Sequence, residues 1–289
     1  MAVFDLIMDE FGTISSDSDD VPYGYGYCLA ERGTDADNLR TTLSNKFPNG
    51  LHFKNIRRKR KISKVNEVVP LLSTGDRIWF GAHVCTDPSY GRDKYFRALS
   101  GQLSNSDTPS TSMMDKISKA PLSQGGLVDP TDILPDVKGV ARLLSTYSPL
   151  IRFPVLGLLK SDDAPGSIEI HVHIGEVGRS QKFQKQLKLI ANKLTQNWET
   201  SFNEYVKAGL IEPRQCNLTI EVTQADVDPL FSLADMFAHV AHHYFKDLDA
   251  DSGLGKDLYN AVKPVLINEL WLPEKASLVA GISHYPPLS

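Results

Sequence analysis

The chain has 289 residues, of which 41% are hydrophobic and 23% charged, and its formal net charge is -4. This composition is that of a globular protein with a sizeable core, and it excludes both overall disorder and a broadly basic nucleic-acid coat. The N-terminus MAVFDLIMDEFGT meets acidic residues early, and no later run approaches the roughly 18 apolar residues of a membrane span. We therefore expect a cytoplasmic protein without a membrane segment.

The first third of the chain predicts a β-meander interrupted by helices. Residues 2–8 and 23–31 are strand-like and are joined by the acidic, Ser-rich turn SSDSDDVP. A polar helix near 35–47, a loop with basic residues and an amphipathic helix near 62–72 follow. A third strand is predicted at 77–85 from the run RIWFGAHVC.

The rest of the chain is predicted to contain an insertion, followed by further helices and strands. We predict an inserted loop or helical region over 91–135, because its later part is rich in Ser, Pro, Gly and Asp. Beyond it the sequence predicts a helix near 136–148, a strand at 168–174, a long helix at 181–208 ended by Gly209, a strand at 217–222, and helices from 231 and near 256–270 before a Pro-rich tail.

The order of these elements indicates the fold class. Three strands in succession, followed by strands that alternate with helices, imply a sheet with an antiparallel first half and parallel crossovers later. We therefore predict an α/β protein with a ribonuclease H-like mixed five-stranded sheet, flanked by helices and carrying insertions, and we predict that residues 1–289 form a single domain.

An acidic pair, Asp9 and Glu10, comes directly after the apolar run VFDLIM, and Gly12 then allows a tight turn. This places the pair at the carboxyl end of the first strand, where open α/β sheets gather ligands. Adjacent carboxylates repel each other without a counter-charge, and a divalent cation is one way to supply it. The alternative is that Asp9 alone faces a cleft, while Glu10 is solvated or pairs with a cation.

A second acidic cluster follows the predicted strand NLTIEV, with Asp226 and Asp228 in a turn and Asp235 on the next helix. A carboxylate within an apolar helix must reach a cleft, a partner or the surface, because unpaired burial is costly. The acids of this cluster are therefore candidates for the same site as Asp9. Alternatively, Asp226 or Asp228 caps the helix and Asp235 lies on its exposed face.

Histidines and one further acid add to the candidates. His239 and His242 lie on roughly the same helical face as the preceding acid, either as proton-transfer or metal-binding groups or as surface residues. On the fourth strand, His171 and His173 alternate with apolar residues and so point to one face. Glu176, just beyond that strand, could join the first acidic pair across the sheet.

A basic cluster follows the loop GLHFKN. Its members are Arg57, Arg58, Lys59, Arg60 and Lys61. His52 precedes the cluster, and a histidine beside cations suits phosphate contact or proton transfer, although a solvated basic loop is the alternative. The sequence contains no P-loop, GxGxxG motif, GxSxG elbow or HExxH motif. Metal-dependent phosphoryl transfer is the chemistry that remains.

Three short motifs carry a family resemblance: M-D-E-F-G-T, G-L-H-F and D-P-L-F-S-L-A-D-M-F. They resemble a strand ending in I-D-E-S-G, a downstream histidine and a late D-x-x-L-A-D-L helix in the bacterial domain of unknown function 3800. The resemblance implies a ribonuclease H-like fold and a metal-dependent nuclease activity. By position, the family's polar residues would be Asp9, Glu10, His52, Asp228 and Asp235.

The chain departs from that family at two places. Phe11 stands where the family has Ser, and Gly175-Glu176 stands where many members have an acidic pair. If Glu176 does not replace the usual aspartate, the site loses one metal ligand.

The first hypothesis is a nuclease that uses Mg²⁺ or Mn²⁺ to hydrolyse phosphodiester bonds of DNA or RNA. Its catalytic residues would be Asp9, Glu10, His52, Glu176, Asp228 and Asp235, and its metal ligands Asp9, Glu176, Asp228 and Asp235. The basic cluster would position the nucleic acid. The second hypothesis is a non-catalytic module of the same fold that binds nucleic acid or protein, as in a defence or toxin-like system. The third is hydrolysis of a small phosphorylated metabolite.

Overall fold

The structure is a computed structural model of the whole chain. It describes residues 1–12, 23–72, 77–85, 154–159, 164–175, 181–196, 198–207, 209, 211–223, 228–247, 252–266, 277–279 and 282–285. The predicted inserted region at 91–135, the predicted helix near 136–148 and Glu176 lie outside these residues.

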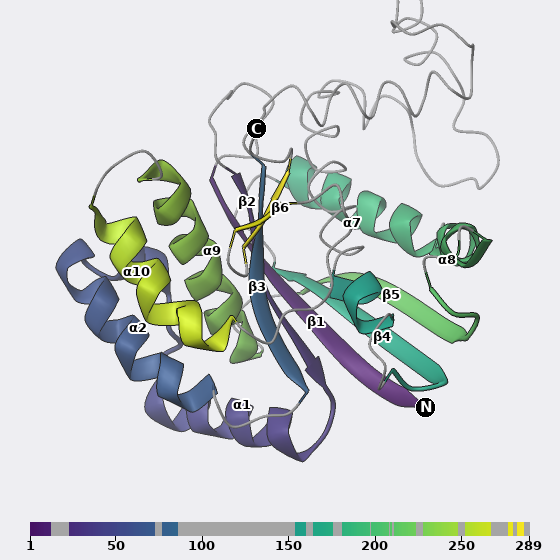
Figure 1. The fold of residues 1–289 in the computed structure, drawn as a ribbon, viewed down its shortest axis with the longest axis horizontal. Coiled ribbons are helices and arrows are strands. Elements are labelled where there is room, and N and C mark those ends of the chain that lie inside the picture. Colours follow the sequence, from purple (N-terminus) through teal and green to yellow (C-terminus); the bar gives the residue numbers. More distant parts are fainter. Residues whose placement is uncertain are drawn as a thin grey trace, which may run out of the picture.

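A mixed sheet forms the centre of the molecule (Figure 1). Its strands are β1 (Ala2–Phe11), β2 (Tyr23–Glu31), β3 (Ile78–Cys85), β4 (Ser167–Gly175), β5 (Gln215–Thr223), β6 (Ser277–Val279) and β7 (Ile282–Tyr285), in the spatial order β5-β4-β1-β2-β3-β7-β6. The pairs β1-β2, β2-β3 and β6-β7 are antiparallel, whereas β1-β4, β4-β5 and β3-β7 are parallel. The carboxyl ends of β1, β4 and β5 therefore meet at one edge of the sheet.

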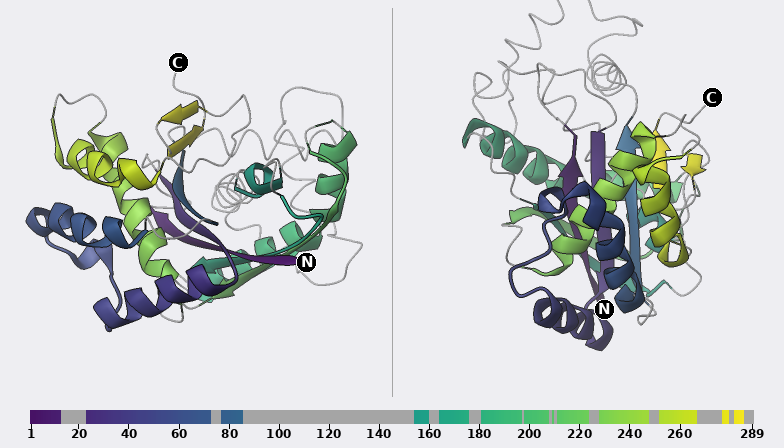
Figure 2. Two further views of the ribbon diagram at one scale, coloured as in Figure 1. Left: turned by 60° about the horizontal axis from the view of Figure 1, so that its bottom comes forward. Right: turned by 90° about the vertical axis from the view of Figure 1, so that its left-hand side faces the viewer.

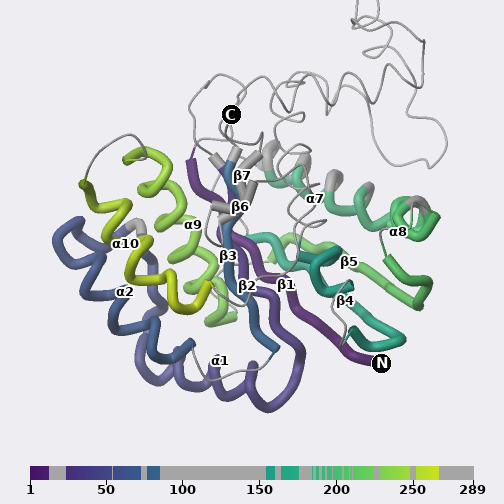
Figure 3. The backbone as a smooth tube through the Cα atoms, viewed as in Figure 1, coloured from purple at the N-terminus to yellow at the C-terminus, as the bar shows by residue number. Residues whose placement is uncertain are grey.

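Helices cover both faces of this sheet (Figure 2). They are α1 (Thr34–Lys46), α2 (Arg58–Leu72), α7 (Gln181–Gln196), α8 (Trp198–Lys207), α9 (Leu230–Lys246) and α10 (Leu254–Val262), with the short 3-10 helices η1 (Phe53–Asn55) and η3 (Lys263–Val265). One core joins the sheet to α1, α2, α9 and α10, and a second joins its other face to α7 and α8. On the first face, α10 contacts both α2 and α9 (Figure 3).

The period of two along β1 assigns its residues to these two cores. Ile7 and Phe11 are buried on the α9 side, and Leu6 and Met8 are buried on the α7 side. Asp9 belongs to the first set by alternation, and it therefore points toward the face that α9 covers.

Helix α9 lies very close to β2, at Gly26. A Cβ built on Gly26 would lie 2.1 Å from the carbonyl oxygen of Ala234 and 2.3 Å from the amide nitrogen of Ala238. Only glycine allows the main chain of a helix to approach a strand this closely. Since Gly26 is the register partner of Asp9, the same contact fixes α9 beside the end of β1.

The prediction of an α/β fold with a mixed sheet flanked by helices is confirmed, and the five predicted strands are neighbours in it. The sequence indicated only a Pro-rich tail after the last helix, whereas in the structure β6 and β7 extend the sheet beyond β3. The single helix predicted at 181–208 is two helices, α7 and α8, and Gly209 follows the second with a φ of 66°, as a helix-ending glycine does. Within the described residues, no helix has the length and apolar character needed to cross a membrane.

Candidate functional site

The predicted acidic pair is divided between the two faces of the sheet. Asp9 pairs in register with Gly26, and Glu10 pairs with Tyr25, whose ring belongs to the core on the α7 side. The amide N–H of Glu10 donates a hydrogen bond of 2.9 Å to Oδ1 of Asp9. Because neighbouring strand residues point in opposite directions, Asp9 and Glu10 do not present two carboxylates to one ion.

The carboxylate of Asp9 lies close to the end of β4, at Gly175. The parallel register places Met8 beside Ile174, and Gly175 is the next residue of β4. A Cβ on Gly175 would lie 3.4 Å from Oδ1 of Asp9 and 3.4 Å from Cε1 of Phe231, in the first turn of α9. The carboxylate therefore occupies a position between β4 and α9, and Glu176 follows Gly175 directly in the chain.

Asp228 has a structural role that uses both of its oxygens. Oδ1 accepts the amide N–H of Leu230 at 2.9 Å, which caps the start of α9. Oδ2 accepts a hydrogen bond of 3.0 Å from Nε of Arg40, on α1. The capping alternative is therefore the one that the structure displays, and both oxygens of Asp228 are already engaged by N–H groups of the chain.

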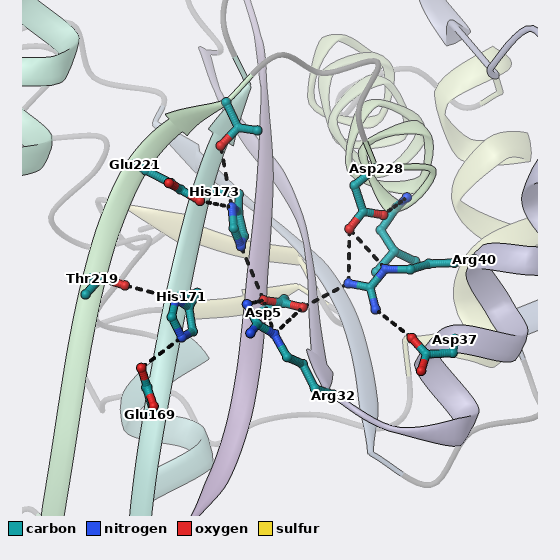
Figure 4. A network of polar contacts seen from close by, with 12 residues as sticks. Asp5, Arg32, Asp37, Arg40, Glu169, His171, His173, Thr219, Glu221 and Asp228 are labelled. Atoms are coloured by element: carbon teal, nitrogen blue, oxygen red, sulfur yellow. Dashed lines mark hydrogen bonds and ion pairs between the residues drawn. The ribbon is translucent and has the colours of Figure 1, made fainter.

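A buried ionic network, which the sequence did not reveal, surrounds Asp5 on β1 (Figure 4). Asp5 is only 4% exposed, yet it accepts hydrogen bonds of 2.7 Å from Arg32 and 2.9 Å from Arg40. Nε2 of His173, on β4, lies 3.2 Å from Oδ1 of the same carboxylate. Arg40 contacts Asp5 and Asp228 with one guanidinium, so the network ties β1 to α1 and to the start of α9.

This environment keeps Asp5 ionised. Burial raises the pKa of Asp5, but the hydrogen bonds from His173, Arg32 and Arg40 outweigh it and lower the pKa far below the usual range. The pKa of Arg40 is raised, because Asp228 and Asp5 outweigh the effect of its burial. The apolar run around Asp5 was the one signal in the sequence, since a buried aspartate in a strand requires partners.

The two histidines of β4 point to one face, as predicted. Their rings stack with centroids 6.5 Å apart. Nε2 of His171 lies 3.0 Å from a carboxylate oxygen of Glu169, and Nδ1 of His173 lies 2.8 Å from a carboxylate oxygen of Glu221, on β5. His173 thus lies between the carboxylates of Asp5 on β1 and Glu221 on β5, and it links these strands to β4.

Asp235 is buried, and it holds the η1 loop against α9. Its Oδ2 accepts the amide N–H of Phe53 at 2.5 Å, and its Oδ1 lies 3.5 Å from Nε2 of His239. His52, which is exposed, is the residue just before Phe53. The structure therefore brings Asp235, His52 and His239 to one corner of the molecule.

The basic cluster was expected in a loop, but α2 begins at Arg58, so most of the cluster forms the first turn of this helix. Arg57, Arg58, Lys59 and Arg60 are exposed. Lys61 differs from them, because it is 7% exposed and its Nζ donates a hydrogen bond of 2.8 Å to the carbonyl oxygen of Phe53. Burial lowers the pKa of Lys61, and the nearby Asp235 opposes this change.

The predicted metal ligands can be compared with this geometry. Among the described residues, no three His, Cys, Asp or Glu side chains are grouped so that they could hold a metal ion. Asp9, Asp228 and Asp235 therefore do not form a metal-binding set by themselves. A metal at the edge of the sheet would need Glu176 beside Asp9, together with water or substrate oxygens.

The chain matches no family model and no curated protein in the comparisons.

Proposed function

We propose that this chain is a metal-dependent nuclease with a ribonuclease H-like fold, and that Asp9 is the anchor of its site. The observation that carries the proposal is the position of the Asp9 carboxylate at the carboxyl end of β1, over Gly175 at the end of the parallel strand β4. Ligands collect at such an edge in open α/β sheets. The mixed strand order and the motifs that resemble those of domain of unknown function 3800 support the same proposal.

The ligand set that we propose is smaller than the sequence suggested. Asp9 and Glu176 would hold a Mg²⁺ or Mn²⁺ ion, whereas Asp228 and Asp235 are engaged in holding α1 and η1 to α9. When bound, such an ion supplies charge for the attack of water on a phosphodiester. The chain's own contribution is to fix the Asp9 carboxylate, through the amide N–H of Glu10 and the close packing of α9 on Gly26.

The exposed cations at the start of α2 would bind the substrate. Arg57, Arg58, Lys59 and Arg60 are exposed and belong to consecutive positions of the chain. Arginine binds phosphate through paired N–H groups, so these residues suit a nucleic-acid backbone. Lys61 is left out of this contact, since its ammonium is turned to the carbonyl oxygen of Phe53.

The test is cleavage of labelled single- and double-stranded DNA and RNA with Mn²⁺ or Mg²⁺. We expect Asp9→Asn to lower the cleavage rate by more than about 100-fold, because loss of a direct ligand should exceed the effect of losing an outer-shell partner. Asp35→Asn, an exposed acid on α1, is the matched control and should cleave as the parent does. The proposal is wrong if the parent cleaves none of the four substrates, or if Asp9→Asn cleaves as fast as the parent.

A second candidate is a non-catalytic nucleic-acid-binding module, and the structural bonds of Asp228 and Asp235 favour it. This candidate predicts that the parent and Asp9→Asn bind a labelled oligonucleotide equally and that neither cleaves it. Changing Arg57, Arg58, Lys59 and Arg60 to Gln would weaken this binding and flatten its dependence on salt. Binding without turnover would therefore select the second candidate.

A further inference from the structure

A second group of cations and rings lies where the start of α2, the η1 loop and the last turns of α9 meet. We call this group the α2–α9 corner. It consists of Arg57, Arg58, Lys59, Arg60, Lys61, Phe53, His239, His242, His243 and Lys246. Its exposed members are the four cations at 57–60 and Lys246.

Direct contacts link the two helices of the corner through η1. Nζ of Lys61 donates to the carbonyl oxygen of Phe53 at 2.8 Å and lies 5.3 Å from the centroid of its ring. The Phe53 ring lies 6.3 Å from the ring of His239, which stacks on His243 at 6.2 Å. His242 also packs against His243, at 5.7 Å between ring centroids. His243 is therefore connected to the buried lysine of α2 by a continuous row of rings.

The charges around His243 are mainly positive. The charged groups that face it are Lys61 and Arg58 from α2 and Lys246 and Asp247 from the end of α9. Burial lowers the pKa of His243, and Lys61, Arg58 and Lys246 lower it further, while Asp247 opposes them. The carboxylate of Asp247 also accepts the amide N–H of Gly255 at 2.8 Å, which engages it at the start of α10. The neighbouring titratable rings are His239 and His242.

Cations from two helices that act on one imidazole form a site of positive potential. An anion placed there would be attracted by both Arg58 and Lys246, and it would favour the protonated form of His243. A strand of nucleic acid fits this arrangement better than a single small anion does, because the exposed cations are spread over two elements. Repeated phosphates can engage such a surface one after another.

We infer that the α2–α9 corner is one continuous surface for a nucleic-acid backbone, in which Lys246 acts together with the cations of α2 and His243 takes up a proton when a phosphate binds. The inference rests on the proposed contact between the basic cluster and nucleic acid, and it does not depend on cleavage at Asp9. It adds Lys246 and His243 of α9 to the nucleic-acid surface, which the sequence did not indicate.

The sign of the proton linkage follows from the charges. In the free protein, burial and three cations favour the neutral form of His243 by lowering its pKa, whereas a bound phosphate would favour the imidazolium. The complex then holds more protons than the free protein, so binding becomes tighter as the pH falls and weaker as it rises. One proton gives at most about a tenfold change in affinity for each pH unit.

The experiment measures the binding of a fluorescein-labelled 20-nucleotide single-stranded DNA by anisotropy, without divalent metal, at several salt concentrations and between about pH 5.5 and 8. The variants are Lys246→Gln and His243→Gln. Lys188→Gln, an exposed lysine on α7 on the opposite side of the sheet, is the matched control. Circular dichroism and urea melts establish that each variant is folded.

We expect Lys246→Gln to weaken binding and to reduce the slope of log affinity against log salt by about one. His243→Gln should retain binding at pH 8 and lose the part of the pH dependence that lies near neutral pH. Lys188→Gln should match the parent in both respects. A competing polyglutamate peptide should displace the DNA only at much higher concentration, since it lacks phosphates.

The inference is overturned by no DNA binding by the parent, by a Lys246→Gln variant that behaves as Lys188→Gln does, or by an unchanged pH dependence in His243→Gln. Polyglutamate that competes as well as DNA would show a peptide surface instead and would also overturn it. If the parent cleaves DNA but Lys246→Gln binds normally, this inference alone fails. If Lys246 and His243 behave as expected and no substrate is cleaved, only the proposed nuclease activity fails.

Discussion

The close packing of α9 on β2 can be tested by adding one methyl group, in Gly26→Ala. The new Cβ would lie 2.1 Å from the Ala234 carbonyl oxygen and 2.3 Å from the Ala238 amide nitrogen, whereas ordinary contact begins at 3.4 Å. Both atoms belong to the main chain, so no side-chain rotation relieves the contact. The helix must therefore move away from the sheet by about 1 Å along the end that carries Ala234 and Ala238.

Forced overpacking of this kind costs typically about 1–3 kcal/mol, and we expect the upper end because a whole helix must shift. With an m-value of about 3 kcal/mol per molar urea, the midpoint of urea unfolding would fall by about 1 M. The control is Gly166→Ala, because Gly166 is exposed and an added Cβ there meets no atom within 4 Å. Equal midpoints for Gly26→Ala and Gly166→Ala would refute the reasoning.

Three further changes probe the charged groups. The ionised form of Asp5 stabilises the fold, because its pKa in the folded chain lies far below the unfolded value of about 4. This stability is fully present above the unfolded value and is lost progressively as the pH falls through the lower folded-state pKa. Asp5→Asn should therefore destabilise the chain at pH 7 by about 3–5 kcal/mol in urea melts, and by somewhat less at pH 3, where the unfolded carboxyl is mostly protonated but the folded one is still ionised. Asp228→Ala removes a cap and the partner of Arg40, and it should cost about 1–2 kcal/mol in the same assay. Lys61→Met removes a cation that lowers the pKa of His243, so this pKa should rise in an NMR titration; an unchanged value would contradict the electrostatic account.

Strand β4 was predictable from sequence because its burial alternates with a period of two. In β4, Ile168, Ile170, Val172 and Ile174 are buried, and the residues between them are partly exposed. The same period placed His171 and His173 on one face. In contrast, β6 and β7 have three and four residues, which are too few to show such a period in a tail rich in proline.

The partners of the acids were not predictable, because they come from distant parts of the chain. Arg40 and Asp228 are 188 residues apart, and Phe53 and Asp235 are 182 apart. The local sequence suggested that Asp228 either caps a helix or binds a metal. The contact of its Oδ2 with Arg40 depends on the position of α1, which the local sequence does not reveal. Similarly, the five basic residues look alike in sequence, but Lys61 alone is buried, because its Nζ donates to the carbonyl oxygen of Phe53 in η1.

Asp5 and Asp9 show how one strand can use the same residue type in two ways. They lie on one face of β1, four residues apart, but their neighbours in the sheet differ. Asp5 is enclosed by two guanidinium groups and a histidine, which satisfy its carboxylate and make it a structural link between β1 and α1.

At Asp9 the neighbouring strands provide glycine: Gly26 in β2 and, one residue beyond the last paired position, Gly175 in β4. Gly26 admits the backbone of α9, and Gly175 leaves room for the carboxylate itself, since a Cβ there would already be in contact with Oδ1. A larger residue at Gly26 would displace the helix, whereas a Cβ at Gly175 would come only into ordinary contact with the Asp9 carboxylate. Gly26 therefore lets α9 pack beside the end of β1, where the Asp9 carboxylate lies next to Gly175 of β4.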